Sequence, residues 1–364
     1  MSHILKVVAY LPIIMLIYYV IRKDWYAYEE NIINKCIQIK TILISSIVIG
    51  LYSLSYNRTF WWADVTYYDR LFCNGLTIPE SPGLNLIYYI LHMFTCNTDI
   101  LLFTVSATAC LIMLFSYRIY DEAEPSCILF LLLSIFFIET CQVNLKQGVA
   151  CGLASIFFAE IMKKGYVSAL ALAIIATLFH VTAGPILLIS FFVVWAININ
   201  NRLVKIIVLS SVIISLFRFD ALIEIIGRMG SFIPGLNDKL LEYTSPSGII
   251  ESDTTLLVVF KGIPYYLISI VGLYDRKFYK DEIAHYDSYL AISFLASVSY
   301  VMSGFSYWMS RVINYYWMTD FVFFGLLLSK MENTNNRLII RSWFILMMFV
   351  LTFRELIQIY ILQL

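Results

Sequence analysis

Long apolar runs recur from one end of the chain to the other, and short polar or charged segments separate them. Each run is close to the length of a transmembrane helix, which needs about 20 residues to cross a bilayer. The pattern therefore predicts an all-helical polytopic membrane protein with about twelve transmembrane helices. The predicted spans are 4–21, 40–56, 100–117, 125–141, 147–162, 166–181, 184–199, 203–217, 254–273, 287–303, 312–329 and 342–361.

One more apolar segment, LNLIYYILHMF at 84–94, is too short to cross a bilayer. Counting it as a span would also move every later loop to the opposite side of the membrane. That change would conflict with the tendency of Lys and Arg to collect in cytoplasmic loops. We therefore expect this segment to be interfacial or re-entrant.

The positions of Lys and Arg predict the topology, because short loops rich in these residues stay in the cytoplasm. All of the basic clusters fall on one side, and this puts the N-terminus outside. The first apolar run should remain as a helix, since charged residues follow it instead of the small-residue cleavage site of a signal peptide. The cytoplasmic clusters are Arg22, Lys23, Lys35 and Lys40; Lys163 and Lys164; Arg202 and Lys205; Arg276, Lys277 and Lys280; and Lys330, Arg337 and Arg341.

Composition supports the same class, since 60% of the residues are hydrophobic and only 14% are charged. The apolar runs leave no room for a separate soluble domain, so residues 1–364 are expected to form a single integral membrane domain. The 25 basic residues are balanced by 25 acidic ones. Because a nucleic-acid-binding surface needs clustered basic residues, we expect no nucleic-acid partner.

Two predicted external loops, 57–99 and 218–253, are much longer than the others. Long loops with their own aromatic and charged pattern are more often binding elements than connectors. In the second loop, apolar residues at 222, 225, 226 and 229 recur at helical spacing, which predicts a helix on the membrane surface. A lid that only packs on the bundle is the alternative.

Lys146 begins an apolar helix on the predicted outer face, and a break with the sequence FHVTAGP follows one helical hairpin later. A cation at the mouth of a hydrophobic bundle is costly, so it usually has a functional partner. The seven cysteines show no metal-ligand spacing with histidine, and no Gly-rich phosphate loop is present. We therefore expect a metal-independent reaction without a cofactor. Cys73 and Cys96 share the external side, where a disulfide between them is one of two open alternatives.

Two motifs stand in the first predicted external loop. The segment ADVTYYDRLF places Asp64, Tyr68 and Phe72 at the spacing D-x-x-x-Y-x-x-x-F, and the segment IPESPGLNLIYYIL follows it with Glu80 and an inserted serine. These segments resemble the G-x-D-x-x-x-Y-x-x-x-F and E-P-G-F elements of the EpsG-like and Wzy-type polysaccharide polymerases of bacteria, although Ala63 stands where a glycine-containing lead is usual.

Three later motifs extend the resemblance over most of the chain. The segment NLKQGVA resembles N-x-x-R-Q-x-x-A, with Lys146 in place of the usual arginine. A lysine keeps the positive charge but cannot form the two-pronged hydrogen bonds of a guanidinium. FHVTAGP is similar to the F-H-x-S-A break, with Thr182 for serine. The last motif, R-x-x-x-Y-[YF], has its counterpart in Arg311, Tyr315 and Tyr316.

The resemblance implies glycosyl transfer at the periplasmic face of the bacterial inner membrane, from undecaprenyl diphosphate onto a lipid-linked repeat unit. Such chemistry needs cations for the diphosphate, a base near the acceptor hydroxyl and a greasy groove for the lipid tails. By analogy of fold alone, the bundle would be GT-C-like. The implied catalytic residues are Asp64, His180, Lys146 and Arg311, and the implied substrate-binding residues are Tyr68, Arg70, Glu80, Asn144, Gln147, Arg218, Arg228, Tyr315 and Tyr316.

Several alternatives stay open. Asp64 could simply pair with Arg58 or Arg70 and hold the loop, and His180 could hydrogen-bond a carbonyl freed by the helix break. The external aromatic residues could be a membrane-interface belt. An O-antigen ligase uses the same donor, and a flippase would bind the lipid-linked oligosaccharide without breaking a bond. Association with a chain-length regulator is likewise open.

Overall fold

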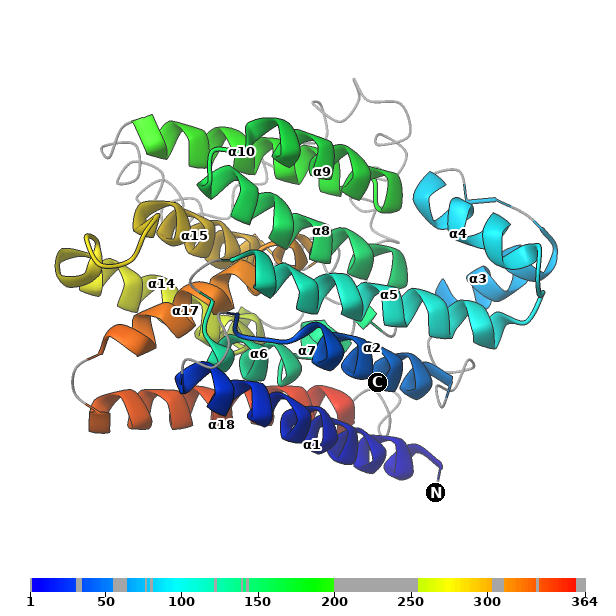
Figure 1. Cartoon of the computed structure of the whole chain (residues 1–364), viewed down its shortest axis with the longest axis horizontal. Coiled ribbons are helices and arrows are strands. Elements are labelled where there is room, and N and C mark those ends of the chain that lie inside the picture. The colour runs from blue at the N-terminus through cyan, green and yellow to red at the C-terminus, as the bar shows by residue number, and fades with distance from the viewer. Residues whose placement is uncertain are drawn as a thin grey trace. The chain divides into compact units, whose positions relative to one another are not determined.

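The computed structural model describes residues 2–30, 35–54, 64–75, 77–78, 81–120, 123–138, 140–141, 144–199, 255–302, 311–331 and 334–357. All regular secondary structure in these ranges is helical (Figure 1). Three of the described helices are both long and apolar enough to span a membrane, and shorter apolar helices accompany them. The long ones are Thr98–Ile119, Leu145–Met162 and Asn335–Phe353; the shorter ones are Ile39–Leu54, Tyr166–Phe179 and Ala183–Ala196.

The chain forms two compact units, residues 1–191 with 321–364, and residues 192–320. The second unit holds the end of α10, α14 (Thr255–Tyr279), α15 (Tyr286–Met302), the 3-10 helix η2 (Arg311–Tyr315) and the start of α17. The prediction of one integral domain stays a prediction. The first unit holds α1 (Ser2–Glu29), α2 (Ile39–Leu54), α3 (Asp64–Cys73), α4 (Pro82–His92), α5 (Thr98–Ile119), α6 (Pro125–Leu132), α7 (Ile135–Ile138), α8 (Leu145–Met162), α9 (Tyr166–Phe179), most of α17 (Trp317–Lys330), α18 (Thr334–Ile357) and the start of α10 (Ala183–Ile199).

Helices α2 and α5 pack against each other in opposite directions. Gly50, near the end of α2, lies so close to Phe103, near the start of α5, that a Cβ on Gly50 would be 2.9 Å from that ring. Before the start of α2, the Cys36 thiol donates to the Tyr117 carbonyl near the end of α5, at 3.6 Å. The two helices therefore form an antiparallel pair, as the predicted spans 40–56 and 100–117 require.

Helices α5 and α8 run in the same direction and approach each other through two glycines of α8. A Cβ on Gly148 would be 3.2 Å from the Ala109 Cβ, and a Cβ on Gly152 would be 2.7 Å from the Ile112 Cγ2. Glycines four residues apart lie on one face of a helix and let two backbones approach closely inside a membrane. The shared direction is the one that the predicted spans 100–117 and 147–162 require.

The predicted continuous span 125–141 is wrong in one respect, because the helix is broken between α6 and α7. The Ser134 amide donates to the Leu131 carbonyl at 3.0 Å, which tightens the last turn of α6. The break leaves the Leu133 carbonyl without a partner in its own helix, and the Thr352 hydroxyl of α18 donates to it at 2.6 Å. Broken helices at membrane depth persist where neighbouring side chains satisfy the freed backbone groups.

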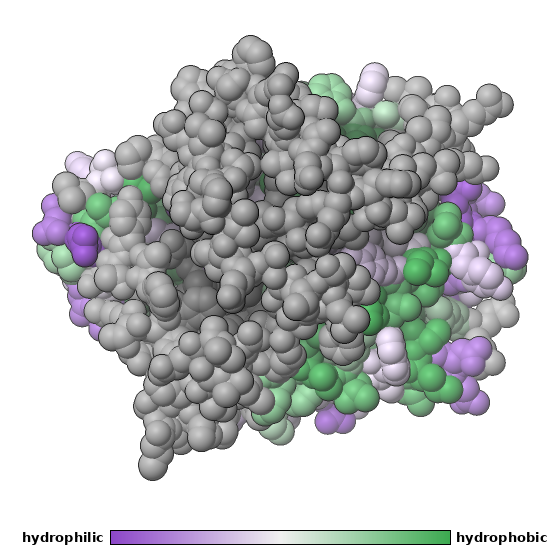
Figure 2. All heavy atoms as spheres, turned by 180° about the vertical axis from the view of Figure 1, so that it is seen from behind, coloured by the Kyte–Doolittle hydropathy of each residue, from purple (hydrophilic) through white to green (hydrophobic). Residues whose placement is uncertain are grey.

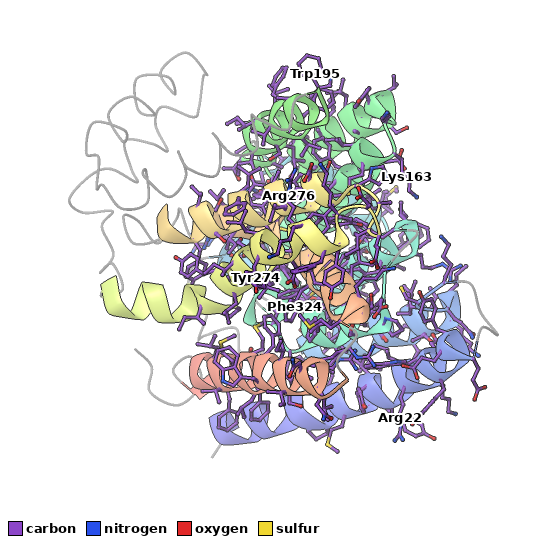
Figure 3. All side chains as sticks on the ribbon, turned by 90° about the vertical axis from the view of Figure 1, so that its left-hand side faces the viewer. Arg22, Lys163, Trp195, Tyr274, Arg276 and Phe324 are labelled. Atoms are coloured by element: carbon purple, nitrogen blue, oxygen red, sulfur yellow. The ribbon has the colours of Figure 1, made fainter. Side chains whose placement is uncertain are left out.

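Large apolar side chains cover the outward surfaces of several helices. On α9, Val167 is 85% exposed, and on α10 Ile189 is 60% exposed. Trp195 projects from the surface of α10 in Figure 3, and Figure 2 shows green hydrophobic residues exposed over the described part of one face. Exposed apolar surface of this extent is expected of helices in contact with lipid. Together with the helix lengths it identifies a polytopic membrane protein; which end of the helices faces the outside stays a prediction.

Candidate functional site

The site begins at the N-terminal end of α8. Asn144 occupies the N-cap position, and its carbonyl accepts the first helical hydrogen bond from the Gly148 amide at 2.9 Å. Its side chain does not cap the helix. The Asn144 Oδ1 atom is buried and has no hydrogen-bond partner among the described residues. A buried amide oxygen without a partner is costly, so this atom is a candidate for contact with a ligand.

Lys146 and Gln147 follow in the first turn of the same helix. Gln147 is 1% exposed, whereas Lys146 is only partly buried. The first turn of any helix carries amide groups that lack helical acceptors, and the helix dipole adds partial positive charge there. Lys146 adds a full positive charge at the same place. The start of α8 therefore has the electrostatic character of an anion-binding site.

Helices α8 and α9 form an antiparallel hairpin around the turn at Lys163, Lys164 and Gly165. Lys164 adopts a left-handed conformation with φ 62°, and the Gly165 amide closes the turn on the Glu160 carbonyl at 2.8 Å. Because the two arms of a hairpin end on the same side, the start of α8 and the end of α9 lie at one end of this pair. His180 therefore lies at the same end of the bundle as Lys146.

His180 ends α9, and its backbone bends into an extended conformation before α10 begins. The Thr182 hydroxyl lies 2.7 Å from the His180 Nδ1 atom, a hydrogen bond in which either group can be the donor. Both residues are partly buried. The contact fixes the imidazole ring relative to the helix break. A hydrogen bond to one ring nitrogen of a histidine also fixes the direction of the other, which is a requirement for a general base.

The short helices α3 and α4 lie against this same end. Gly83, at the start of α4, packs so closely on the end of α9 that a Cβ there would be 3.0 Å from the Phe179 ring. The Phe72 ring of α3 contacts the Tyr88 ring of α4 with centroids 5.4 Å apart. Figure 1 shows both helices beside the N-terminal part of α5. Helix α4 has 11 residues, so the prediction that 84–94 is too short to span a bilayer is confirmed, whereas its interfacial or re-entrant position stays a prediction.

Basic residues mark the opposite end of these helices. The Lys163 ammonium donates to the Ile119 carbonyl at the end of α5, at 2.6 Å, and the Arg118 guanidinium donates to the Ile37 carbonyl before α2. Lys146 and Lys163 are thus about 25 Å apart along an axis that rises about 1.5 Å per residue. The separation agrees with the prediction that Lys146 lies on the side away from the basic loops.

The predicted residues near the C-terminal part of the chain belong to the other compact unit. Arg311 opens the 3-10 helix η2 and is partly buried, whereas Tyr315 and Tyr316 are 1% and 3% exposed. Because Arg311 and Lys146 lie in different units, their convergence on one chamber stays a prediction.

The remaining predicted residues are only partly described. Tyr68 is buried within α3, and Arg70 is exposed on the same helix. Asp64 is the first residue of α3, and its side chain lies outside the described residues, as do Glu80, Arg218 and Arg228. Cys73 and Cys96 are both free thiols, and the Cys73 thiol donates to the Cys96 carbonyl at 3.5 Å.

Sequence reasoning missed the two glycines that set the position of α8. A Cβ on Gly148 would lie 2.0 Å from the Thr140 carbonyl oxygen, so only glycine fits there. The G-x-x-x-G spacing of Gly148 and Gly152 within an apolar run was the signal that could have revealed this contact.

Comparison with known proteins identifies the protein family. The helices and their lipid-facing surfaces define a polytopic membrane protein. The EpsG family model matches residues 40–363, which is most of the chain, so the protein belongs to the EpsG family. The resemblance predicted from the sequence motifs is thereby confirmed, and membership associates the protein with polysaccharide biosynthesis. No curated protein and no solved structure matched the chain.

Proposed function

We propose that the protein is a polysaccharide polymerase. It transfers a growing glycan from undecaprenyl diphosphate onto a sugar hydroxyl of a lipid-linked repeat unit, at the periplasmic face of the bacterial inner membrane. The observation that carries the proposal is the start of α8 in a chain of the EpsG family, because both Lys146 and the buried Asn144 oxygen belong to this helix N-terminus. The full membrane domain of this proposal has about twelve spans and a GT-C-like arrangement.

The proposed role of Lys146 is to hold and neutralise the diphosphate leaving group. Negative charge grows on a diphosphate oxygen as the glycosidic bond breaks, and a positioned cation stabilises this charge more in the transition state than in the ground state. The helix dipole of α8 acts in the same direction. Arg311, together with Arg218 or Arg228, is proposed to supply further positive charge around the diphosphate.

The acceptor hydroxyl needs a group that takes its proton as the new bond forms. In our proposal this group is Asp64 or His180. The Thr182 contact supports His180, because it fixes one ring nitrogen and so orients the other. Asp64 is supported by its place at the start of α3, since α3 and α4 lie at the same end of the bundle as His180.

The lipid tails need an apolar surface that begins at this site. Ile174 and Leu178 on α9 are 64% and 43% exposed, and Leu188 on α10 is 48% exposed. These side chains flank the helix break that carries His180. A polyprenyl chain lying on them would bury apolar area, worth about 25 cal/mol per Å², while its diphosphate stays at the membrane surface.

The deciding experiment gives the purified protein lipid-linked repeat units in detergent, without nucleotide or metal. Longer glycans on the lipid support a polymerase. Unchanged lipid that crosses the bilayer of reconstituted vesicles would indicate a flippase, and transfer to a different acceptor would indicate an O-antigen ligase.

Matched variants test the role of Lys146. Lys146→Gln should reduce elongation by at least about a hundredfold, since a group that stabilises transition-state charge is worth about 3 to 4 kcal/mol. Lys146→Arg should keep most of the activity, because it keeps the charge. Lys164→Gln, at the opposite end of α8, is the control and should elongate glycans normally. Equal activity in Lys146→Gln and Lys164→Gln would overturn the assignment.

A further inference from the structure

A cluster of serine hydroxyls links α14 and α15 within the unit 192–320. The Ser269 hydroxyl of α14 lies 2.9 Å from the Ser293 hydroxyl and 2.7 Å from the Ser297 hydroxyl, both on α15. Ser293 and Ser297 are four residues apart, so they lie on one face of their helix. The Ser297 hydroxyl also donates to the Tyr265 carbonyl at 3.2 Å. The result is a continuous row of oxygen atoms between two apolar helices.

Asp320 lies at one end of this row. Its side chain is 0% exposed, in the first turn of α17 and within the predicted span 312–329. The Ser293 hydroxyl lies near the carboxyl group. Neither carboxyl oxygen, however, has a partner among the described residues that meets both the distance and the angle criteria of a hydrogen bond. No ion pair connects Asp320 to any Lys, Arg or His among the described residues.

An ionised carboxylate in this position would be expensive. Removing a carboxylate from water costs several kcal/mol even after relaxation, and one neighbouring hydroxyl does not offset that cost. Ionisable residues inside membrane spans therefore usually bind something of opposite charge or belong to a proton or ion pathway. The serine cluster supplies oxygen atoms, which are the ligands that small hard cations prefer.

We propose that Asp320 and the hydroxyls of Ser293, Ser269 and Ser297 bind one small monovalent cation, a proton or Na⁺. The shared chemistry is a single positive charge that neutralises the buried carboxylate. With a proton on Asp320, each hydroxyl can donate to the next oxygen, and the row ends on the Tyr265 carbonyl. With Na⁺, the carboxylate and the nearest hydroxyls turn their oxygens toward the ion. This site is independent of the proposed glycosyl transfer.

The experiment measures the thermal unfolding midpoint of the full-length protein in detergent. One arm varies NaCl against choline chloride at constant ionic strength and pH, and the other varies pH without Na⁺. A cation that binds only the folded state raises its stability by mass action. The wild-type midpoint should rise by about 2 °C or more in one of the arms. A response to Na⁺ at fixed pH identifies sodium. A midpoint that rises as the pH is lowered, by an amount that Asp320→Asn reduces, identifies the proton.

Variants make the result specific. Asp320→Asn is neutral without a bound cation, so it should lose the response to Na⁺, and in the pH arm it should lose the part of the response that Asp320 contributes. The control Asp281→Asn removes an exposed carboxylate from the α14–α15 loop and should keep it. Ser293→Ala introduces no charge and should raise the cation concentration for half-maximal effect about tenfold, through the loss of one hydrogen-bonding ligand. This third variant keeps the test valid if Asp320→Asn fails to fold. A wild type insensitive to both cations, or a Ser293→Ala protein with an unchanged response, would overturn the proposal.

Discussion

Replacing Gly148 with alanine should both destabilise the protein and displace Lys146. The new Cβ would lie 2.0 Å from the Thr140 carbonyl oxygen and 2.9 Å from the Thr140 carbonyl carbon, whereas real Cβ atoms essentially never come within 3.0 Å of such neighbours. Both contacts are with backbone atoms, which cannot rotate away as a side chain can. Either the start of α8 or the end of the preceding segment must therefore move by about 1 Å.

The expected cost follows from two opposing effects. Overpacking a tight contact costs about 1 to 3 kcal/mol, and a backbone neighbour places Gly148→Ala near the upper end of this range. Alanine favours the helix over glycine by about 1 kcal/mol. The net loss is about 2 kcal/mol, which lowers the unfolding midpoint by about 4 °C. A displacement of about 1 Å near reacting groups can reduce the rate on the order of a hundredfold.

The assay combines thermal unfolding with glycan elongation by the purified protein. Gly184→Ala is a suitable control, because the nearest atom to its new Cβ is the Thr177 Oγ1 at 2.8 Å, which belongs to a side chain that can rotate. That variant should change stability by less than about 1 kcal/mol. If Gly148→Ala unfolded at the wild-type temperature and elongated glycans normally, the close contact between Gly148 and Thr140 would be wrong.

Three further predictions concern other contacts. Thr182→Val should reduce elongation about fivefold, because the His180 ring loses a hydrogen bond worth about 1 kcal/mol, whereas Thr182→Ser should keep the activity. Asp287→Asn should lower the free energy of unfolding by about 1 to 3 kcal/mol, measured by thermal unfolding, since the Asp287 carboxylate accepts from the Arg276 Nε at 2.7 Å and from its Nη2 at 3.0 Å. Burial raises the pKa of Glu124 above its ordinary 4.5, so wild-type stability should fall as pH rises from 4.5 through that raised value, and Glu124→Gln should lack this fall.

Each of these has a contradicting outcome. Equal activity of the valine and serine variants at 182 would show that the hydroxyl does not orient the histidine. The contact between Arg276 and Asp287, which joins α14 to α15, would contribute nothing to stability if Asp287→Asn unfolded like the wild type. Parallel pH profiles of wild type and Glu124→Gln would show that the Glu124 carboxyl has an ordinary pKa in the folded protein.

The helical class and the direction of the packed helices followed from hydropathy and charge alone. Hydropathy depends on composition averaged over a whole turn or more, so it locates long elements well. It also identified 84–94 as too short to span, and α4 ends at His92 with 11 residues. The family could be predicted because each motif is a short stretch of sequence that can be recognised without the fold, and the motifs occur in the family's order.

Hydropathy and charge could not predict the helix break at Leu133 and Ser134. Apart from Ser134, residues 127–138 are apolar, and they contain no proline or glycine that would indicate a break. What permits the break is a hydrogen bond from Thr352, a residue far away in the chain. The burial of Asp320 could not be predicted for a different reason. A single carboxylate barely changes the mean hydropathy of the span 312–329, and hydropathy does not show which face of the helix is buried.

The broken helix and the proposed site are connected. Thr140 follows α7, the short helix that the break creates, and its carbonyl is the atom against which Gly148 packs. The position of Lys146 at the start of α8 therefore depends on the contact between Gly148, two residues later, and the Thr140 carbonyl. The position of Thr140 depends in turn on the direction of α7 after the break. A lysine in this position acts as a point charge on a flexible stem and needs its helix to be placed accurately, since it lacks the fixed hydrogen-bonding geometry of arginine. Close packing at Gly148 supplies that placement.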